Sequence, residues 1–550
     1  MSQENESKIV SRRDFLKKTA LTGAGVAVLA TGCAPKVATE AAPIVIPKET
    51  TEEIAWTKEA DIVVVGSGTV AVAALVAAKE GAKVIVIEKA AAFGGTTAIS
   101  GGGFWIPNNF AMKAKGIADS RDGALAYLKR IAEGQSTDEL ITAYVDNSPV
   151  MAEYLRDQFG FTFDVSSGTA YADYYIGEGS VPFGRTLYMY QDGKQVSGAA
   201  MYPAYKTALE GLGVEILMET AGKKLVTNAA GEVIGVIATT AAGDITIKAN
   251  KAVIVGTGGF DFNKTWTKHF LRGPIFFSNA VPTNTGDGHV MGMELGASLR
   301  NMNESWGLPG FVTDPEKLQA ETDWQMYRGK PGAIVVNKYG ERIGNEACPY
   351  EQFQRSFWFY DSGTFEYRNA PSYFIADADY AQYYFFPGSG YQVGVIPDWM
   401  TKADTLEELA TKLGIDFTGL QNTLAVFNPN ALEGIDPVWH RGENPFDINT
   451  AGDYMGRTDL KNICLAPIAK GPFYGAAYYP GTCGTNGGLE INANGQVLHV
   501  TGQPIPRLYA VGNTSGSVMG AGYPGGGGTL GAGFTFSYLA ALHATKLASL

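Results

Sequence analysis

The sequence is poor in cysteine, and its four cysteines do not suit a redox or metal site. It has no C-x-x-C pair, and after Cys33 an odd number of cysteines remains: Cys348, Cys464 and Cys483. This pattern predicts no disulfide framework, no metal site, no iron–sulfur cluster and no covalently attached haem. If the chain carries out redox chemistry, its electrons must pass to or from a separate partner.

Positive charge is also scarce. The chain of 550 residues has a net charge of −12, with 43 Lys and Arg against 55 Asp and Glu. That balance argues against a nucleic-acid partner and gives no basic membrane-binding surface. No internal repeat is present, and the 69 glycines gather in loops, which favours backbone binding of a phosphate-bearing cofactor. The length is sufficient for two domains with large cores.

The N-terminus lacks an apolar stretch long enough to span a membrane comfortably. Apolar residues run only from Ala20 to Ala30, after a segment that reads S-R-R-D-F-L-K from Ser11 to Lys17. This pattern predicts a twin-arginine signal within residues 1–33, read by the twin-arginine translocation machinery, which exports folded proteins. We therefore expect a periplasmic or other extracytoplasmic location.

The end of this signal resembles a lipoprotein cleavage site. Leu29–Cys33 reads L-A-T-G-C, so lipid attachment through Cys33 and simple cleavage are both open. Residues 34–56 are rich in Ala, Pro, Thr and Glu, which predicts a flexible spacer.

The next segment has the order of a dinucleotide-binding unit. An apolar strand over Asp61–Val65 precedes helical spacing over Val70–Glu80. The turn between them carries three small residues at the fingerprint spacing: Gly66, Gly68 and Ala71. Such residues let the backbone approach a pyrophosphate whose charge faces a helix N-terminus. Glu88 ends the second strand, where a carboxylate can accept a hydrogen bond from a ribose hydroxyl. A bound dinucleotide is therefore predicted.

Further glycine motifs indicate that the dinucleotide is FAD. The run F-G-G-T-T-A-I-S-G-G-G ends at Gly103, and two later apolar strands end in glycines near Gly256 and Gly512. A last glycine run at Gly525 to Gly528 opens a helix to about Leu547, whose N-terminus can stabilise the anionic reduced flavin. The residues expected to hold FAD are Gly66, Gly68, Ala71, Glu88, Lys89, Gly94, Gly95, Thr96, Thr97, Ser100, Gly101, Gly102, Gly258, Gly259, Gly512, Asn513, Gly528, Thr529 and Leu530.

Cofactor motifs at both ends of the chain predict a discontinuous domain. We expect an α/β fold in which residues 57–303 and 485–550 form a Rossmann-like FAD-binding domain. Residues 304–484 would form an inserted α+β substrate or catalytic domain, rich in aromatic residues. Helices are expected over 122–132 and 137–159, and strands over 224–226, 233–239 and 245–248.

The G-G-T-T-A and S-G-G-G motifs resemble the fumarate reductase/succinate dehydrogenase flavoprotein superfamily. Members that reduce fumarate hold two carboxylates with charged groups. Three of those positions are lost here, since they fall on Tyr350, Gly484 and Tyr523. The chain is therefore not expected to be a fumarate reductase.

The same three changes resemble the 3-ketosteroid dehydrogenases, especially the Δ1-dehydrogenases. The matching stretches are Ala172–Tyr175 with Gly184–Arg185, Asn345–Tyr350, Tyr523–Gly527, Thr405–Ala410 and His440–Pro445. The family's fold, FAD and an apolar ketone substrate are implied by this resemblance. Family members are usually cytoplasmic, whereas this chain carries an export signal.

The resemblance also implies catalytic roles. The Tyr523 hydroxyl and the Gly527 N–H would donate to the C3 ketone as an oxyanion hole. Tyr350 would take the C2 proton and flavin N5 the C1 hydride. Because tyrosine is a poor base at its ordinary pKa of about 10, Tyr174 would donate a hydrogen bond that stabilises phenolate character at Tyr350.

Other aromatic and charged residues are expected to have structural roles. Packing or pocket lining is expected for Tyr171, Tyr175 and Phe357–Tyr360. Arg185 and Glu346 would fix loops, and Cys348 would be a small buried residue. None of the five histidines falls in a catalytic motif.

Three alternative functions stay open. The enzyme could run in reverse as an ene-reductase of a ketosteroid or other enone, with electrons from a quinol or cytochrome. It could act on the 4,5 bond of the steroid, although the Pro524-Gly525 sequence after Tyr523 favours the 1,2 bond modestly. A lipid-anchored binding protein with structural FAD is a third reading, which the set of tyrosines disfavours.

Overall fold

The computed structural model describes residues 54–166, 172–314 and 319–550. All of these described residues belong to one compact unit. The predicted twin-arginine signal with Cys33, nearly all of the predicted spacer, and Tyr171 lie outside the described residues. None of the helices in the described ranges is both long and apolar enough to cross a membrane.

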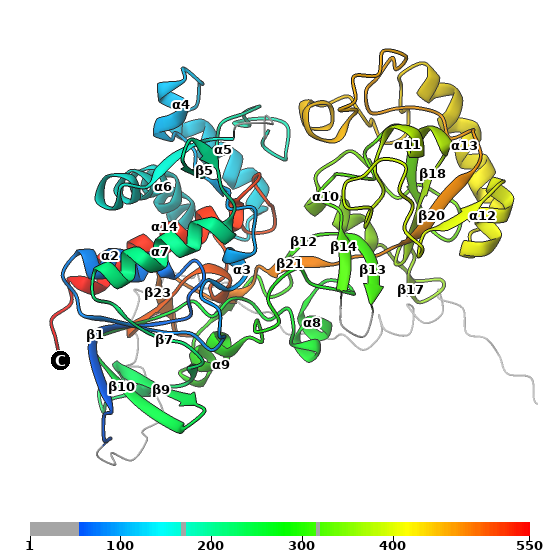
Figure 1. Ribbon diagram of the computed structural model, residues 1–550. Coiled ribbons are helices and arrows are strands. Elements are labelled where there is room, and N and C mark those ends of the chain that lie inside the picture. Colours follow the sequence, from blue (N-terminus) through cyan, green and yellow to red (C-terminus); the bar gives the residue numbers. More distant parts are fainter. Residues whose placement is uncertain (1–53, 167–171, 315–318) are drawn as a thin grey trace, which may run out of the picture. The chain divides into compact units, whose positions relative to one another are not determined.

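The cofactor-binding part is built on a sheet of eight strands (Figure 1). Its main path runs β23(Gln496–Leu498), β24(Pro504–Ala510), β10(Gly243–Val255), β1(Lys58–Val65), β2(Val84–Ile87) and β7(Glu215–Leu217). Strands β24, β10, β1, β2 and β7 pair in parallel. The parallel strands read as continuous apolar runs, such as V-I-V-I in β2, because both of their faces are buried.

Two helices pack together beside this sheet. Helix α2(Ala71–Lys79) follows β1 through the glycine turn, and α14(Gly528–Thr545) contacts it along its length (Figure 1). Both are apolar nearly all round, since they are buried between the sheet and further helices. The predicted strand–turn–helix unit is therefore present, with α2 one residue shorter at each end than the predicted range.

Two strands that were predicted separately form a single strand in the structure. The segments 245–248 and 251–255 were expected as separate strands, but both belong to the single strand β10. The register with β1 continues on both sides of Asn250, with Ile247 opposite Lys58 and Val253 opposite Val63. The shift in that register between Ala60 and Ile62 absorbs the irregularity. Strands β9(Val233–Thr240) and β8(Ala221–Thr227) extend β10 as an antiparallel meander.

A small helical and stranded layer covers the start of α14. Its sheet has the order β3(Phe104–Trp105), β5(Thr186–Gln191), β4(Thr162–Val165), with β6(Lys194–Gln195) beside β5. Its helices are α3(Gly95–Ala98), α4(Phe110–Ala114), α5(Arg121–Ala132), α6(Asp138–Phe159) and α7(Gly198–Gly211). Ser120 and Thr137 cap α5 and α6, because each hydroxyl accepts a hydrogen bond from an N–H of the first turn.

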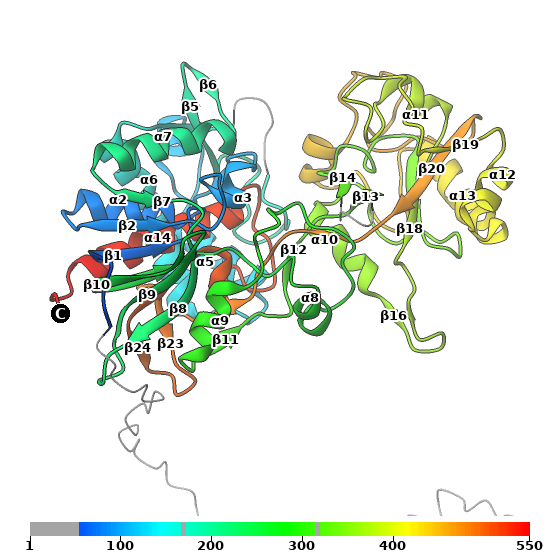
Figure 2. The same ribbon diagram turned by 60° about the horizontal axis from the view of Figure 1, so that its bottom comes forward.

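Residues 304–484 include a separate antiparallel sheet. Its order is β15(Ala333–Val336), β18(Ser372–Ala376), β20(Phe473–Tyr478), β19(Thr401–Ala403). The helices of this part are α10(Tyr350–Arg355), α11(Ala378–Tyr383), α12(Leu406–Leu413) and α13(Phe417–Leu432) (Figure 2). Phe357 is fully buried in its core, but Phe359 and Tyr360 are exposed.

The remaining α-helices and β-strands are short. They are α8(Lys264–Phe270), α9(Asp287–Glu294), β11(Leu299–Arg300), β12(Ser305–Gly307), β13(Gly310–Asp314), β14(Gln319–Thr322), β16(Tyr360–Asp361), β17(Glu366–Tyr367), β21(Thr482–Thr485) and β22(Gly488–Leu489). The predicted fold class, an α/β cofactor domain with further α+β structure, is confirmed. The predicted domain limits stay a prediction.

Candidate active site

A single cavity of about 430 Å³ joins the glycine motifs to the tyrosine motifs. At one end it is lined by the turn after β1, by Glu88 at the end of β2 and by the glycines after β10. At the other end it is lined by Tyr174, Tyr350 and Tyr523. The cavity therefore extends from the dinucleotide-binding turn to the predicted catalytic residues.

The first end is shaped by close contact between two strand ends. Gly66 has φ of +104°, and a Cβ there would lie 2.3 Å from the carbonyl oxygen of Gly256. Only glycine fits, because both the backbone angle and the contact exclude a side chain. The two strand ends thus meet at the cavity, which leaves backbone N–H groups beside it where a pyrophosphate can bind.

Glu88 is fixed at the same end by two hydrogen bonds. Its Oε2 accepts a hydrogen bond from the Ser67 hydroxyl at 2.7 Å, and its Oε1 accepts one from the Ala90 N–H at 2.8 Å. Ser67 Oγ in turn accepts from the Gly94 N–H at 2.7 Å. A buried carboxylate fixed in this way is the acceptor that an adenosine ribose requires. The residues present therefore fit FAD, whose ribose would be held by Glu88.

Most of the predicted cofactor residues line the cavity. Those that do are Gly66, Gly68, Glu88, Lys89, Gly95, Thr96, Thr97, Ser100, Gly101, Gly102, Gly258, Gly512, Asn513, Thr529 and Leu530.

Four predicted cofactor residues do not line it: Ala71, Gly94, Gly259 and Gly528. Ala71 is buried within α2, and Gly94 faces Ala98 and the Tyr202 ring. Gly259 faces the Thr485 hydroxyl, and Gly528 faces the Pro524 ring. These four small residues allow close packing of the cofactor loops instead of touching the cavity.

The three predicted tyrosines form a triangle at the other end. The ring centres of Tyr174 and Tyr350 are 5.6 Å apart, those of Tyr174 and Tyr523 5.5 Å, and those of Tyr350 and Tyr523 5.9 Å. All three rings are buried, and each lines the cavity. Thr529 donates its hydroxyl to Tyr523 Oη at 3.4 Å. Residues separated by more than 300 positions in the sequence are therefore brought together at one place.

Burial raises the pKa of two of these tyrosines, Tyr350 and Tyr523. It raises the pKa of Tyr350 well above the ordinary value, and Tyr174 and Tyr523 raise that pKa further. It also raises the pKa of Tyr523 to about 12, against hydrogen bonds with Thr529 and Tyr350 that lower it. Tyr174 was predicted to favour the phenolate of Tyr350, and this is corrected by the structure. Desolvation of the buried ring dominates, and the hydrogen bond with Tyr174 adds to the rise in pKa.

Backbone hydrogen bonds join the tyrosine segments to one another. The Tyr174 N–H donates to the Pro524 carbonyl at 3.1 Å, and Gln352 donates its side-chain amide to the Tyr174 carbonyl at 2.9 Å. Tyr127 donates its hydroxyl to the same Pro524 carbonyl at 2.6 Å. Tyr174 is thereby fixed between α10, which carries Tyr350, and the loop that carries Tyr523.

Tyr175 and Cys348 lie beside this arrangement and do not line the cavity. Tyr175 donates its hydroxyl to Glu351 at 3.0 Å, so it serves packing and loop fixation. Cys348 was expected to be buried but is only half-buried.

A buried ion network supports the Tyr174 loop from behind. Arg185 pairs with Asp173 at 2.7 Å and with Asp119 at 2.6 Å, and all three side chains are almost fully buried. Asp173 also accepts from the Trp105 indole at 2.8 Å. Burial raises the pKa of Asp173 to about 6, while Arg185 opposes that rise. Arg185 is thus a loop-fixing residue in this structure, as expected.

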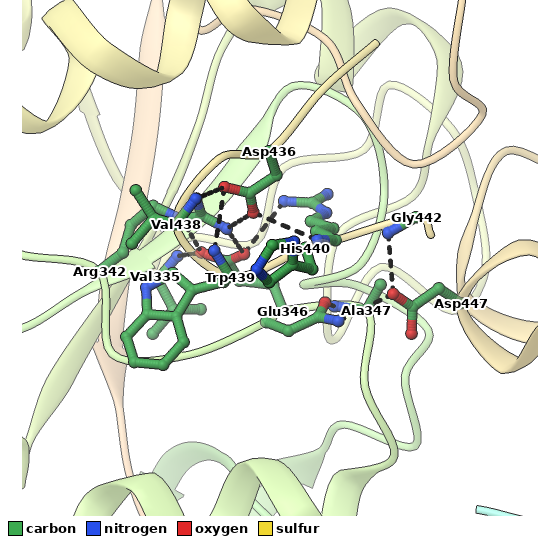
Figure 3. A network of polar contacts seen from close by, with 12 residues as sticks. Val335, Arg342, Glu346, Ala347, Asp436, Val438, Trp439, His440, Gly442 and Asp447 are labelled. Carbon is green, nitrogen blue, oxygen red and sulfur yellow. Dashed lines mark hydrogen bonds and ion pairs between the residues drawn. The ribbon is translucent and has the colours of Figure 1, made fainter. Parts of the chain in front are cut away.

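A second network supports the segment that leads to Tyr350 (Figure 3). Arg342 binds Glu346 at 2.5 Å and Asp436 at 2.8 Å, and Arg441 reaches Glu346 at 3.4 Å. Asn345 donates its amide to Asp447 at 2.8 Å. The next residue to Asp447, Phe446, packs against the Tyr174 ring with centres 5.1 Å apart.

Gly527 lies at the N-terminus of α14 and lines the cavity. Its φ is +88°, and a Cβ there would lie 2.4 Å from the Gly103 carbonyl oxygen. Its carbonyl accepts from the Trp105 N–H at 3.0 Å and from the Gly531 N–H at 2.9 Å. The backbone at Gly527 is therefore immobilised beside Tyr523.

Charged side chains are confined to the dinucleotide end. Among the described residues that line the cavity, the charged ones are Glu88, Lys89 and Asp287, and Lys89 pairs with Asp287 at 2.7 Å. None of the histidines lines the described cavity. No group of three acidic, histidine or cysteine residues in the described part of the chain is placed to hold a metal ion. The tyrosine end thus suits an uncharged group that accepts hydrogen bonds.

Several lining residues were not predicted from the sequence. At the tyrosine end they are Tyr188, Trp324, Cys483 and Gly526, and at the dinucleotide end they include Ser67, Thr69 and Asn284. Trp324 packs edge-on against Tyr350 with ring centres 4.9 Å apart. Ser67, Thr69 and Gly526 lie inside the glycine motifs, whereas no motif surrounds Trp324 in the sequence.

Comparison with known proteins places this geometry in a family. Residues 61–530 match the family described as FAD binding domain. This chain belongs to that family. FAD is its cofactor, and it is an FAD-dependent oxidoreductase, as predicted from the sequence.

Individual relatives cover nearly the whole chain. A 3-oxosteroid 1-dehydrogenase of Mycolicibacterium smegmatis is 34% identical over 88% of this chain and 97% of its own length. A 4-oxocyclohexanecarboxylate 2-dehydrogenase of Sinomonas cyclohexanicum is 32% identical over 87% of this chain and 92% of its own.

A solved structure is also similar. The 3-ketosteroid Δ1-dehydrogenase of Sterolibacterium denitrificans, in complex with 1,4-androstadiene-3,17-dione, has a TM-score of 0.81. It is 30% identical, with 89% of this chain and 100% of that chain covered. The predicted resemblance to 3-ketosteroid dehydrogenases is confirmed by these relatives.

Proposed function

We propose that this oxidoreductase is an exported 3-ketosteroid dehydrogenase that removes one hydrogen each from C1 and C2 of its substrate. The observation that carries the proposal is the triangle of Tyr174, Tyr350 and Tyr523 at the uncharged end of the FAD cavity. Hydroxyl groups converge there without a cation or carboxylate, which suits a neutral ketone and an apolar skeleton.

FAD supplies the acceptor for the hydride that leaves C1. Tyr523 and the Gly527 N–H hold the C3 ketone oxygen, and they bind it more strongly as negative charge develops on it. The pKa of Tyr523 at about 12 keeps its hydroxyl protonated, so that it remains a donor at every physiological pH. Polarising the ketone makes the C2 hydrogen more acidic, which assists its removal.

Tyr350 takes the C2 proton in this proposal. Because burial raises the pKa of Tyr350, its phenolate is a minor species at neutral pH. The reaction then depends on that small fraction and on acidification of C2 by the contacts at the ketone. Tyr174 orients the Tyr350 hydroxyl, and the backbone bonds of Tyr174 to Gln352 and Pro524 fix its own position.

A smaller cyclic ketone that bears a carboxylate is the second candidate. The Sinomonas relative, named for 4-oxocyclohexanecarboxylate, favours it. The charge distribution in the cavity disfavours it, because Lys89, the basic residue among the described lining residues, is paired with Asp287 beside Glu88. A carboxylate at the tyrosine end would be buried without a counter-charge.

Export and electron transfer complete the proposal. The Ser11–Lys17 segment supports export by the twin-arginine machinery, with Cys33 as the site of a lipid anchor. Outside the cytoplasm, a membrane quinone or a cytochrome would reoxidise the flavin. The same carrier in its reduced form would drive the reverse reaction, reduction of an enone.

A substrate panel with an artificial electron acceptor tests the proposal. We expect products two mass units lighter from a Δ4-3-ketosteroid, with a new 1,2 double bond. Much slower turnover is expected with 4-oxocyclohexanecarboxylate than with its neutral methyl ester. Preference for the carboxylate would replace the steroid with the second candidate. A new C4–C5 double bond from a 3-ketosteroid saturated in ring A, with no product from the Δ4-3-ketosteroid, would move the reacting bond.

A further inference from the structure

The peptide between Gly526 and Gly527 is held from outside the cavity by one side chain. Thr186, the first residue of β5, donates its hydroxyl to the Gly526 carbonyl at 2.7 Å. Thr186 is buried and does not line the cavity, whereas Gly526 and Gly527 do. Its contact with the site therefore passes through the backbone alone.

The geometry of a peptide group gives this contact a consequence. The Gly526 carbonyl and the Gly527 N–H belong to the same planar unit, and in a trans peptide they point in opposite directions. Fixing the carbonyl toward Thr186 therefore fixes the N–H on the opposite side. In the described residues, the Gly527 N–H donates to no other group, so it is free to donate to a ligand.

Neighbouring contacts exclude other movements of this peptide. The Gly527 carbonyl is held by the Trp105 and Gly531 N–H groups, and the Gly527 Cα lies against Gly103. Rotation of the Gly526–Gly527 plane is then the remaining freedom at this position. The Thr186 hydroxyl opposes that rotation.

Thr186 is itself placed rigidly. It pairs with Trp105 across β3 and β5, and the preceding residue, Arg185, is fixed by its buried ion pairs with Asp119 and Asp173. Threonine is β-branched and stiff about χ1, so the direction of its hydroxyl changes little. A hydrogen bond to the carbonyl also polarises the peptide, which strengthens donation by its N–H by an amount of about 10–30%.

We propose that Thr186 is a positioning residue of the oxyanion hole, which orients and polarises the Gly527 N–H toward the ketone oxygen. The inference rests on the proposed function, since it assigns the Gly527 N–H to a developing oxyanion. It adds a residue outside the tyrosine motifs that acts without touching substrate or cofactor.

Two variants separate the hydroxyl from the shape of the side chain. Thr186→Val keeps the branched shape but removes the donor, and Thr186→Ser keeps the donor. We expect Thr186→Val to lower kcat on the ketone by about tenfold or more, as a partial loss of one oxyanion donor. Thr186→Ser should stay within about threefold of the wild type, because its hydroxyl still reaches Gly526.

Binding of substituted phenols gives a readout apart from turnover. Phenols of graded acidity place an oxygen of graded negative charge in the hole, and the oxidised flavin absorbance reports their binding. In the wild type and Thr186→Ser, affinity should change steeply with phenol pKa. In Thr186→Val the slope should be flatter, because an N–H that is aimed and polarised less well responds less to the charge.

Thr423→Val is the matched control. Thr423 donates its hydroxyl to the Gly340 carbonyl at 2.6 Å, again a bond from a threonine to a glycine carbonyl, and neither residue lines the cavity. It should keep the wild-type slope and turnover. Thermal melting of the FAD-loaded proteins compares folding, and Thr186→Ala serves if Thr186→Val does not take up FAD.

The outcomes are distinct. A flattened slope together with lower kcat in Thr186→Val, but not in Thr186→Ser, supports the inference. An unchanged slope in Thr186→Val or Thr186→Ala overturns it, even if turnover falls. A wild type that turns over no ketone refutes the proposed function instead, and the phenol slopes still decide whether Thr186 acts on the Gly527 N–H.

Discussion

The two ends of the FAD cavity differ in whether backbone or side chains shape them. The shape of the dinucleotide end depends mainly on backbone, at glycines such as Gly66, where the ends of β1 and β10 meet. The tyrosine end depends mainly on side chains, with Tyr174, Tyr350 and Tyr523 supplied by three distant segments. Cofactor binding therefore tolerates little change of backbone, whereas the reaction depends on single hydroxyl groups.

This difference predicts that each end fails in its own way. A change at the dinucleotide end should prevent flavin binding. A change at the tyrosine end should leave the flavin bound but abolish or slow its reduction by substrate. The variants below test that separation, starting from the largest expected effect.

Gly66→Ala should abolish FAD binding and, with it, all activity. The added Cβ would lie 2.3 Å from the Gly256 carbonyl oxygen, at a φ of +104° that alanine rarely adopts. The ratio of flavin to protein absorbance after purification measures the loss. Gly211→Ala is the control, because no atom lies within 4 Å of a Cβ at that position. Full flavin content in Gly66→Ala would show that the strand ends can separate.

Tyr350→Phe should keep FAD and lose nearly all turnover. The ring still packs against Tyr174 and Trp324, but the group that accepts the proton is gone. General base catalysis contributes about 10²–10⁴-fold, so kcat should fall by that order. The exposed Tyr360, changed to Phe, controls for loss of a hydroxyl elsewhere. Wild-type turnover in Tyr350→Phe would remove Tyr350 as the base.

Tyr523→Phe should have a smaller effect than Tyr350→Phe. It removes one of two donors to the ketone oxygen while the Gly527 N–H remains, and one such donor is typically worth about 3–4 kcal/mol. The loss should appear in kcat for the chemical step, measured by single-turnover flavin reduction. A change confined to KM would mean that Tyr523 only binds the ground state.

The pH dependence tests the role of Tyr350 without a substitution. Reaction requires the deprotonated form of Tyr350, and burial raises its pKa, so the rising part of the profile is displaced to high pH. We expect kcat/KM to rise by about tenfold per pH unit from about pH 7 toward pH 10. Tyr523, with a pKa of about 12, remains protonated through this range. A profile that levels off near neutral pH would contradict the raised pKa of Tyr350.

The dinucleotide end was largely predictable from the sequence because its signals are local. Strand β1, the turn at Gly66 and Gly68, and helix α2 follow one another within 22 residues, from Lys58 to Lys79. The exceptions, Gly94 and Gly528 among them, are small because loops pack on them and not because a ligand does. Sequence spacing does not distinguish these two reasons for glycine.

The tyrosine end was predictable only through resemblance to a family. Nothing in the sequence near Tyr174 indicates that its N–H reaches Pro524 or that Gln352 reaches its carbonyl. Trp324 and Tyr188 line the cavity without a motif around them. The pKa of Tyr350 was predicted in the wrong direction, because burial of its ring raises that pKa and the hydrogen bond with Tyr174 acts in the same direction.

The central claim is most directly tested by mixing the FAD-loaded protein with a Δ4-3-ketosteroid in the absence of oxygen. We predict that the oxidised flavin absorbance bleaches within one turnover and that a Δ1 double bond appears in equal amount. The same protein, reduced beforehand, should be reoxidised slowly by the dienone product. An absorbance that stays unchanged with every ketosteroid, in either direction, would contradict the account.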